Sequence, residues 1–476
     1  MNDQPDRASS RDDLARGLPM FTASAPEVLA KEKAELAELE GKGLLHRWRV
    51  FGAKSGPGWL QSALVLGSGS AMASLFAGAY LQYKLLWVQP LAMVLGIVMF
   101  AAMSYQTLST GIRPFDAMKR FIHPAVAWGW AIGALVATII WHLPQYALAA
   151  GMTDDMIKAT TGWEPSSPAV QTLVLIAIGL GVLALSTTVV WCYSSGHRGI
   201  RIYERTLKTL VWMIILAFLV VIYKAVKSGG MDWAALFKGF LPLHVPTDRR
   251  GVSIVMAAFS AATGINATFL FSYTLLARGW GKEHRDLSRF DLLTGMLLPF
   301  CIATSLMVIA TGCTIYDPVE FAEGSTRLSP MKAAAMFESV GLSPFVSRIV
   351  FGLGILGMAL TSITMHMLIC GFAACEMFGV EPGGWRYRLA CLIPAPGVAG
   401  VVLWQYVGPW IAIPASAICG LMLPVAFIAF FILNNSKRYL GEHKPTGAKA
   451  VVWNIAMIVS ICATLASIIY YLVSLI

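Results

Sequence analysis

Apolar segments recur along most of this chain, and each is close to the roughly 20 residues that an α-helix needs to cross a bilayer. Hydrophobic residues make up 57% of the sequence and charged residues only 13%, too few to cover a water-soluble fold of this size. The pattern predicts an all-α membrane protein with about eleven transmembrane helices. We expect their centres near Val65, Val98, Gly133, Ile178, Ile215, Ala261, Ile302, Met358, Val398, Leu421 and Ile461.

Short polar stretches interrupt two of these apolar segments. Residues 67–70 (Gly-Ser-Gly-Ser) break the first segment, and residues 263–268 (Thr-Gly-Ile-Asn-Ala-Thr) break the sixth. Lipid offers no hydrogen-bond partner to unwound backbone, so such breaks persist only where protein or a substrate cavity covers them. Breaks at corresponding places in two halves are typical of transporters with a midplane site between inverted repeats. Close helix packing is the alternative explanation for the glycines.

The net charge of +10 does not indicate nucleic-acid binding, because the basic residues gather in alternate loops. An excess of Lys and Arg on one side of the membrane is the positive-inside pattern. It predicts a cytoplasmic amino terminus in a multi-pass protein of the cell (plasma or inner) membrane, surrounded by the lipid bilayer. The basic loops contain Arg113, Lys119 and Arg120; Arg198, Arg201, Arg205 and Lys208; Arg278, Lys282, Arg285 and Arg289; Arg386 and Arg388; and Lys437, Arg438, Lys444 and Lys449.

Residues 1–50 are polar and predict a cytoplasmic tail, in which residues 26–40 favour a short helix, while residues 51–476 form the transmembrane domain. No phosphate-binding GxxxxGK motif followed by Ser or Thr occurs, so ATP-driven transport is not indicated. The eight cysteines lack the close pairs of a zinc site. We expect neither an enzyme nor a bound cofactor.

Several short stretches occur together in the order and spacing of one transporter family. They are Gly56-Pro57-Gly58; Ala77-Gly78-Ala79 with Tyr83-Lys84-Leu85-Leu86-Trp87; Gly199-Ile200-Arg201 with Glu204; Thr361-Ser362-Ile363-Thr364; Arg386-Tyr387-Arg388 with Ile393-Pro394-Ala395; Leu423-Pro424; and Asn435-Ser436-Lys437-Arg438-Tyr439-Leu440-Gly441. Over about residues 50–476 the combination resembles the Nramp (natural resistance-associated macrophage protein) divalent-metal transporters. The resemblance implies a LeuT-like fold, with inverted five-helix repeats at about residues 56–228 and 250–434 and an extra helix at about residues 450–475.

The candidate site departs from that family's pattern. The family's Asp-Pro-Gly-Asn falls on residues 67–70, so a carboxylate and an amide are lost, and its Met-Pro-His falls within one position of residues 265–267. The acidic pair that the resemblance places in the third span falls on His142 and Gln145, and a glutamine in the tenth falls on about Ser416.

The residues left at the two breaks offer mostly neutral oxygen atoms. Such a set suits a hard ion such as Mg²⁺, held with part of its water, better than iron or manganese. Restoring the lost chemistry with Ile265→Met and Gly67→Asp should then shift the preference toward manganese and iron. The expected substrate-binding residues are Gly67, Ser68, Ser70, Thr263, Ile265, Asn266, Thr268 and Ser416, with Ser68, Ser70 and Asn266 as the candidate metal ligands.

Ionisable side chains inside the predicted spans are few. His142 is the main candidate for gating or proton transfer, together with Gln145, although a neutral histidine bonded to a carbonyl is the alternative. We expect His366 to make structural hydrogen bonds and Glu376 to belong to an ion pair near the inner side.

These observations favour a secondary transporter of a divalent cation of the Mg, Mn or Fe class, with weak proton coupling. The protein would work by alternating access and could be a monomer. Two alternatives stay open, namely a carrier of a small organic solute on the same scaffold and a non-transporting membrane sensor or scaffold protein.

Overall fold

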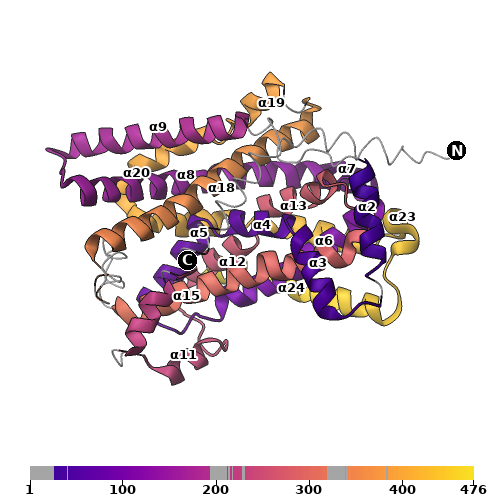
Figure 1. Ribbon diagram of the computed structural model, residues 1–476, viewed down its shortest axis with the longest axis horizontal. Helices are drawn as coiled ribbons and strands as arrows, with labels where there is room; N and C mark the ends of the chain where they lie inside the picture. Colours follow the sequence, from indigo (N-terminus) through magenta and orange to yellow (C-terminus); the bar gives the residue numbers. More distant parts are fainter. Residues whose placement is uncertain are drawn as a thin grey trace.

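The computed structural model describes residues 26–39, 41–192, 231–318, 343–381 and 384–476, parts of 209–227, and residues 338 and 341. Throughout these residues the chain forms helices joined by turns and irregular segments, without any strand (Figure 1). For this part of the chain the predicted all-α class is confirmed. The family-like stretch around Gly199 and Glu204 lies outside the described residues, as do residues 1–25.

The first span is broken. Helices α4 (Pro57–Val65) and α5 (Ser68–Leu81) differ in direction by 55°. Only Leu66 and Gly67 leave the helical conformation, with ψ of 52° and −164°. The break is therefore shorter than the sequence suggests: Ser68 and Ser70, which we expected inside it, lie in the first turn of α5, where small residues are tolerated.

Three long, apolar helices and one short helix follow the first broken span. The longest, α8, spans 38 residues and contains Pro144. These helices are α6 (Val88–Thr110), the short α7 (Pro114–Phe121), α8 (Pro124–Thr161) and α9 (Pro168–Cys192).

The second half contains the other break. Helix α12 (Arg249–Ala262) ends and α13 (Ile265–Ala277) begins with only Thr263 and Gly264 between them, and the two continue as one span without a bend above 40°. The predicted interruption of residues 263–268 is thus reduced to two residues. Asn266 and Thr268 lie in the first turn of α13.

The following segments complete the bundle. Gly408 has a positive φ of 54°, a conformation that glycine adopts at no steric cost, and it redirects the chain after α20. The helices are α14 (Arg285–Asp291), the π-helical turn η3 (Leu292–Leu297), α15 (Leu298–Thr314), α18 (Pro344–Phe378), α19 (Trp385–Ala390), η4 (Ala395–Ala399), α20 (Gly400–Val407), η5 (Gly408–Ile411), α21 (Ala412–Gly420), α22 (Leu423–Asn435) and α24 (Gly447–Val473).

Two groups of helices pack against each other. Helices α9, α18 and α20 all contact α8, α9 also contacts α18 and α20, and the four lie side by side in the upper part of Figure 1. Helix α12, labelled in the lower part of Figure 1, contacts α5, α6, α21 and α24. Both breaks lie where the two groups meet, because α8 also contacts α5, α13 and α21.

The described residues cover the predicted spans only in part. The described residues contain eight helices long and apolar enough to cross a membrane, or nine when the bent α4–α5 pair is counted. Residues 385–435 are counted there as one span although the turn at Gly408 divides them, and the expected fifth span near Ile215 is only partly described. The figure of eleven stays a prediction.

Candidate functional site

A small cavity lies between the two breaks. It offers about 20 Å³ to a water-sized sphere, which is room for a single water molecule or ion. Six helices contribute to its wall: α4 and α5 at the first break, α12 and α13 at the second, and α8 and α18. Its lining consists of Leu64, Val65, Gly67, Gly69, Ser70, Trp141, Gln145, Ala261, Gly264, Asn266 and His366.

At the first break, side chains bind the backbone groups that the bend sets free. Gln145 Oε1 accepts a hydrogen bond from Ser68 N at 3.2 Å, and Ser70 Oγ donates to Val65 O at 2.6 Å. Ser362 of α18 donates to Leu64 O at 3.4 Å. Because buried backbone groups are costly when unpaired, these three side chains make the bend tolerable in the bundle core.

At the second break, only one of the two polar atoms of the Asn266 side-chain amide has a hydrogen-bond partner. Its Oδ1 accepts from Ala267 N at 2.9 Å, while its Nδ2 is buried without a hydrogen-bond partner. Thr268 is fully engaged, since its Oγ1 donates to Ile265 O at 2.6 Å and accepts from Trp130 Nε1 at 3.1 Å. Of these side chains, that of Asn266 reaches the cavity.

Two of the expected binding residues face other helices. A Cβ placed on Gly96 of α6 would lie 1.7 Å from Thr263 Cγ2, so the Thr263 side chain packs on α6. A Cβ placed on Gly133 of α8 would lie 3.0 Å from Ile265 Cδ1, so Ile265 packs on α8. Neither residue is part of the cavity wall.

The glycines of the first break allow side chains to come close to the backbone. A Cβ on Gly67 would lie 2.7 Å from both Gln145 Nε2 and Ser362 Oγ, and a Cβ on Gly69 would lie 2.5 Å from Ser416 Oγ. Ser416 in turn accepts from Trp141 Nε1 at 2.9 Å. Close packing and the lining of a cavity are therefore not alternatives at these positions, because the glycines serve both.

A pair of buried histidines adjoins the cavity. His142 Nδ1 of α8 and His366 Nδ1 of α18 are 3.2 Å apart, and His366 is the member that lines the cavity. The ring of Trp141 is stacked nearly parallel to that of His366, at an interplanar angle of 6°. His142 Nε2 is enclosed without a hydrogen-bond partner.

The expected site residues thus separate into two sets. Gly67, Ser70, Gln145 and Asn266 line the cavity. The others adjoin it or face neighbouring helices: Ser68, whose Oγ is buried without a partner, and Thr263, Ile265, Thr268, Ser416 and His142. Their roles in binding stay predictions.

Trp141 and His366 are lining residues that were not assigned to the site from the sequence. The spacing of four between Trp141 and Gln145 places both on one face of a helix, and this signal was available. No comparable signal linked His366 to the breaks. Among the described residues no group of three or more His, Cys, Asp or Glu side chains is placed to hold a metal ion.

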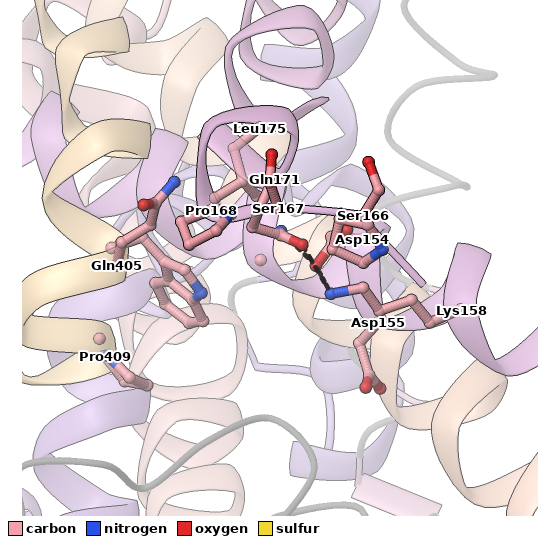
Figure 2. Close-up of a pocket in the computed structure, with 14 residues that line it drawn as sticks. Asp154, Asp155, Lys158, Ser166, Ser167, Pro168, Gln171, Leu175, Gln405 and Pro409 are labelled. Atoms are coloured by element: carbon pink, nitrogen blue, oxygen red, sulfur yellow. Dashed lines mark hydrogen bonds and ion pairs between the residues drawn. The ribbon is translucent and has the colours of Figure 1, made fainter. Parts of the chain in front are cut away.

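A much larger hollow lies elsewhere, beside the end of α8 that precedes α9. It measures about 660 Å³ and is lined from α8, the loop to α9, α9 and α20, as Figure 2 shows. Its charged groups are largely paired: Lys158 Nζ lies 2.9 Å from Asp154 Oδ2, which also accepts from Gln171 Nε2 at 3.0 Å. None of its lining residues belongs to either break.

Buried charges also occur at the end of the bundle where α4 begins. Asp291 accepts from Gly58 N at 2.6 Å and Gly56 N at 3.0 Å, which caps the first turn of α4. Glu376 of α18, whose side chain is 3% exposed, forms an ion pair of 3.0 Å with Arg113. The expected ion pair of Glu376 is confirmed.

Comparison with known proteins agrees with this architecture. The family described as natural resistance-associated macrophage protein-like (Nramp) matches residues 58–470. No curated protein matches the chain.

Three solved structures illustrate the fold. The manganese transporter of Eremococcus coleocola, in complex with an aromatic bis-isothiourea substituted compound, is 17% identical, covers 90% of this chain and 88% of its own, and gives a TM-score of 0.66. MhsT in complex with L-phenylalanine is 14% identical, with coverage of 86% and 98% and a TM-score of 0.54. Mhp1 in its inward-facing conformation is 14% identical, with coverage of 88% of both chains and a TM-score of 0.53. The broken helices, the cavity between them and the family match over residues 58–470 together show that this chain belongs to the Nramp family and has its LeuT-like fold.

Proposed function

We propose that this protein is a secondary carrier that moves a divalent metal cation of the Mg, Mn or Fe class across the membrane. Membership of the Nramp family supports this proposal, and so does similarity in fold to a manganese transporter. In alternating access, the halves of the broken spans would move against the group formed by α8, α9, α18 and α20, so that the cavity opens to each side in turn.

The size of the cavity is the observation that carries the proposal. Pockets for organic ligands of ordinary size measure about 300–1,000 Å³. The cavity between the breaks measures about 20 Å³. A metal ion that has lost most of its water fits such a space, whereas an amino acid or nucleobase requires it to expand greatly.

The composition of the wall supports weak coupling to protons. Asp, Glu, Lys and Arg are absent from the eleven lining residues. A cation at this depth is therefore held by amide, hydroxyl, carbonyl and imidazole groups, none of which carries a permanent negative charge. Among the described residues, Glu376 and Asp154 form ion pairs and Asp291 caps α4, and none of the three lines the cavity.

Uptake into proteoliposomes tests the proposal. The full chain is reconstituted with a pH-sensitive dye in the lumen and supplied with Mn²⁺, Mg²⁺ or a mixture of amino acids. We expect saturable uptake of at least one metal, with little acidification of the lumen. Amino-acid uptake without metal uptake would support the organic-solute carrier instead, and absence of all uptake would support the sensor or scaffold protein. Strong acidification that persists in His142→Ala would overturn the weak coupling.

Asn266→Ala provides the matched test of the site. It removes a cavity-lining amide, and we expect metal uptake to fall at least about tenfold, because the lining offers few other side-chain oxygen donors to the metal. Ser253→Ala is the control, since Ser253 lies on α12 and its hydroxyl donates only to Arg249 O. Equal uptake by both variants would show that the metal does not pass through this cavity.

A further inference from the structure

His366 brings into the cavity a chemical group that neither break provides. It reaches the wall from α18, while the oxygen-bearing residues Ser70 and Asn266 reach it from α5 and α13. An imidazole nitrogen is a good ligand for first-row transition metal ions such as manganese, iron, zinc and copper, whereas Mg²⁺ prefers oxygen. The cavity therefore holds one donor that can discriminate between these two groups of metals.

The ring of His366 is held in a defined orientation. Trp141 stacks on it at an interplanar angle of 6°, and its Nδ1 lies 3.2 Å from His142 Nδ1. Since Nδ1 is occupied by this contact, Nε2 is the nitrogen left to face the cavity. Metal-binding histidines commonly use one nitrogen for the metal and fix the ring through the other.

The contact between the two histidines has a direct consequence for the lone pairs. When two Nδ1 atoms share a hydrogen bond, one carries the proton and donates, and the other accepts the hydrogen bond with its lone pair. When His366 is the donor, its Nε2 has no proton and presents a lone pair. His142 then carries its own proton on Nε2, the atom that is buried without a partner.

We propose that His366 Nε2 is a ligand of the transported cation, that His142 is the positioning residue that fixes the required tautomer, and that this nitrogen favours Mn²⁺ over Mg²⁺. The inference rests on the proposed function and specifies its substrate class. Ser70, Gln145 and Asn266 supply oxygen atoms around the same space. The nitrogen takes the place of a soft ligand that neither break supplies.

Pulsed electron paramagnetic resonance of bound Mn²⁺ tests the ligand directly. Two samples of the full chain in nanodiscs are loaded with Mn²⁺. One is made with histidine of natural isotope content and the other with nitrogen-15-labelled histidine. We expect nitrogen hyperfine coupling from one imidazole, which changes with the label. Mn²⁺ bound without such coupling would overturn the inference, even if uptake occurs. If the protein neither binds nor takes up Mn²⁺ or Mg²⁺, the proposed function itself is refuted.

Variants then assign the nitrogen to one residue. His366→Gln should abolish the coupling, whereas His284→Gln, at an equally buried histidine outside the cavity, should retain it. His142→Phe should keep the coupling but weaken Mn²⁺ binding about 10- to 100-fold, as is usual when the partner of a metal-binding histidine is lost. Coupling that survives in His366→Gln, or unchanged Mn²⁺ preference over Mg²⁺ in that variant, would overturn the assignment. If a variant does not fold, the labelled unsubstituted protein still shows whether an imidazole binds the metal, and His366 is the histidine among the lining residues.

Discussion

The two breaks occupy corresponding places in the two halves of the chain, yet they are stabilised differently. At the first, α4 and α5 differ in direction by 55°, and Gln145 bonds the exposed backbone at Ser68. At the second, α12 and α13 continue without a bend above 40°, and a Cβ on Gly264 would lie 2.4 Å from the ring of Trp141. At the first break, side chains of two other helices, Gln145 of α8 and Ser362 of α18, therefore bond the backbone. At the second, the side-chain hydrogen bonds to backbone come from its own residues Asn266 and Thr268, and Trp141 of α8 packs closely on Gly264.

This difference shows that similar polar stretches do not produce similar geometry. Side-chain ends such as those of Gln145 and Ser362 can shift by a few tenths of an ångström. The Trp141 ring has less freedom, because it is stacked on His366 and bonded to Ser416. We therefore expect the second break to tolerate substitution less well than the first.

The largest expected effect concerns Gly264→Ala. The added methyl group meets the Trp141 ring at 2.4 Å and Asn266 Oδ1 at 2.5 Å, so we expect a loss of about 1–3 kcal/mol in stability together with strongly reduced metal uptake. Gly67→Ala, where the nearest atoms at 2.7 Å end flexible side chains, should lose less. Thermal unfolding in detergent measures both. A larger loss in Gly67→Ala would reverse the comparison.

The next effect concerns Gln145, which supports only the first break. Gln145→Leu leaves Ser68 N buried without its acceptor, at a cost of about 1–3 kcal/mol. Gln145→Glu keeps the acceptor and adds a negative charge at the cavity wall, so it should preserve stability better and bind Mn²⁺ more tightly. Thermal unfolding and calorimetric titration distinguish the two variants. If both are equally destabilised, the hydrogen bond to Ser68 does not maintain the bend.

A charge introduced at the first break should affect binding more than stability. In Gly67→Asp the new Cβ would lie 2.7 Å from Gln145 Nε2 and Ser362 Oγ, so both side chains must shift, and both can then donate to the carboxylate. We expect Mn²⁺ affinity to rise at least tenfold, since opposite charges about 4 Å apart in a protein attract by about 4 kcal/mol. Calorimetry measures the dissociation constant, with Gly67→Asn as the uncharged control. Equal affinity in the two variants would place the metal away from this break.

The smallest effect is expected for Ile265→Met at the second break. The sequence alone suggested that a thioether here would favour manganese and iron. In the structure Ile265 packs on Gly133 and is not part of the cavity wall, so the substitution should leave the preference of Mn²⁺ over Mg²⁺ nearly unchanged. Competition between the two ions in the uptake assay measures this preference. A clear shift toward Mn²⁺ would show that the second break rotates during transport.

Local patterns in the sequence accounted for the main architecture. Long apolar segments identified the membrane fold, and the polar stretches located both breaks to within a few residues. Four expected site residues, Gly67, Ser70, Gln145 and Asn266, line the cavity. Such features depend on residues close together in the chain, because a helix needs length and apolarity to cross a membrane and an unwound turn needs small or polar residues.

Tertiary structure decided which side chains meet. Most of these helices are apolar on every side, so no amphipathic face shows how each one is rotated about its axis. The sequence consequently could not indicate that Ile265 turns toward α8, or that His366 of α18 reaches the same cavity as Asn266. Nor could it distinguish a 55° bend from a nearly straight break, because the difference depends on Gln145 and Trp141, which belong to a third helix. The sequence pattern thus determined where the backbone leaves the helical conformation. Packing between helices determined which side chains contact that backbone and line the cavity beside it.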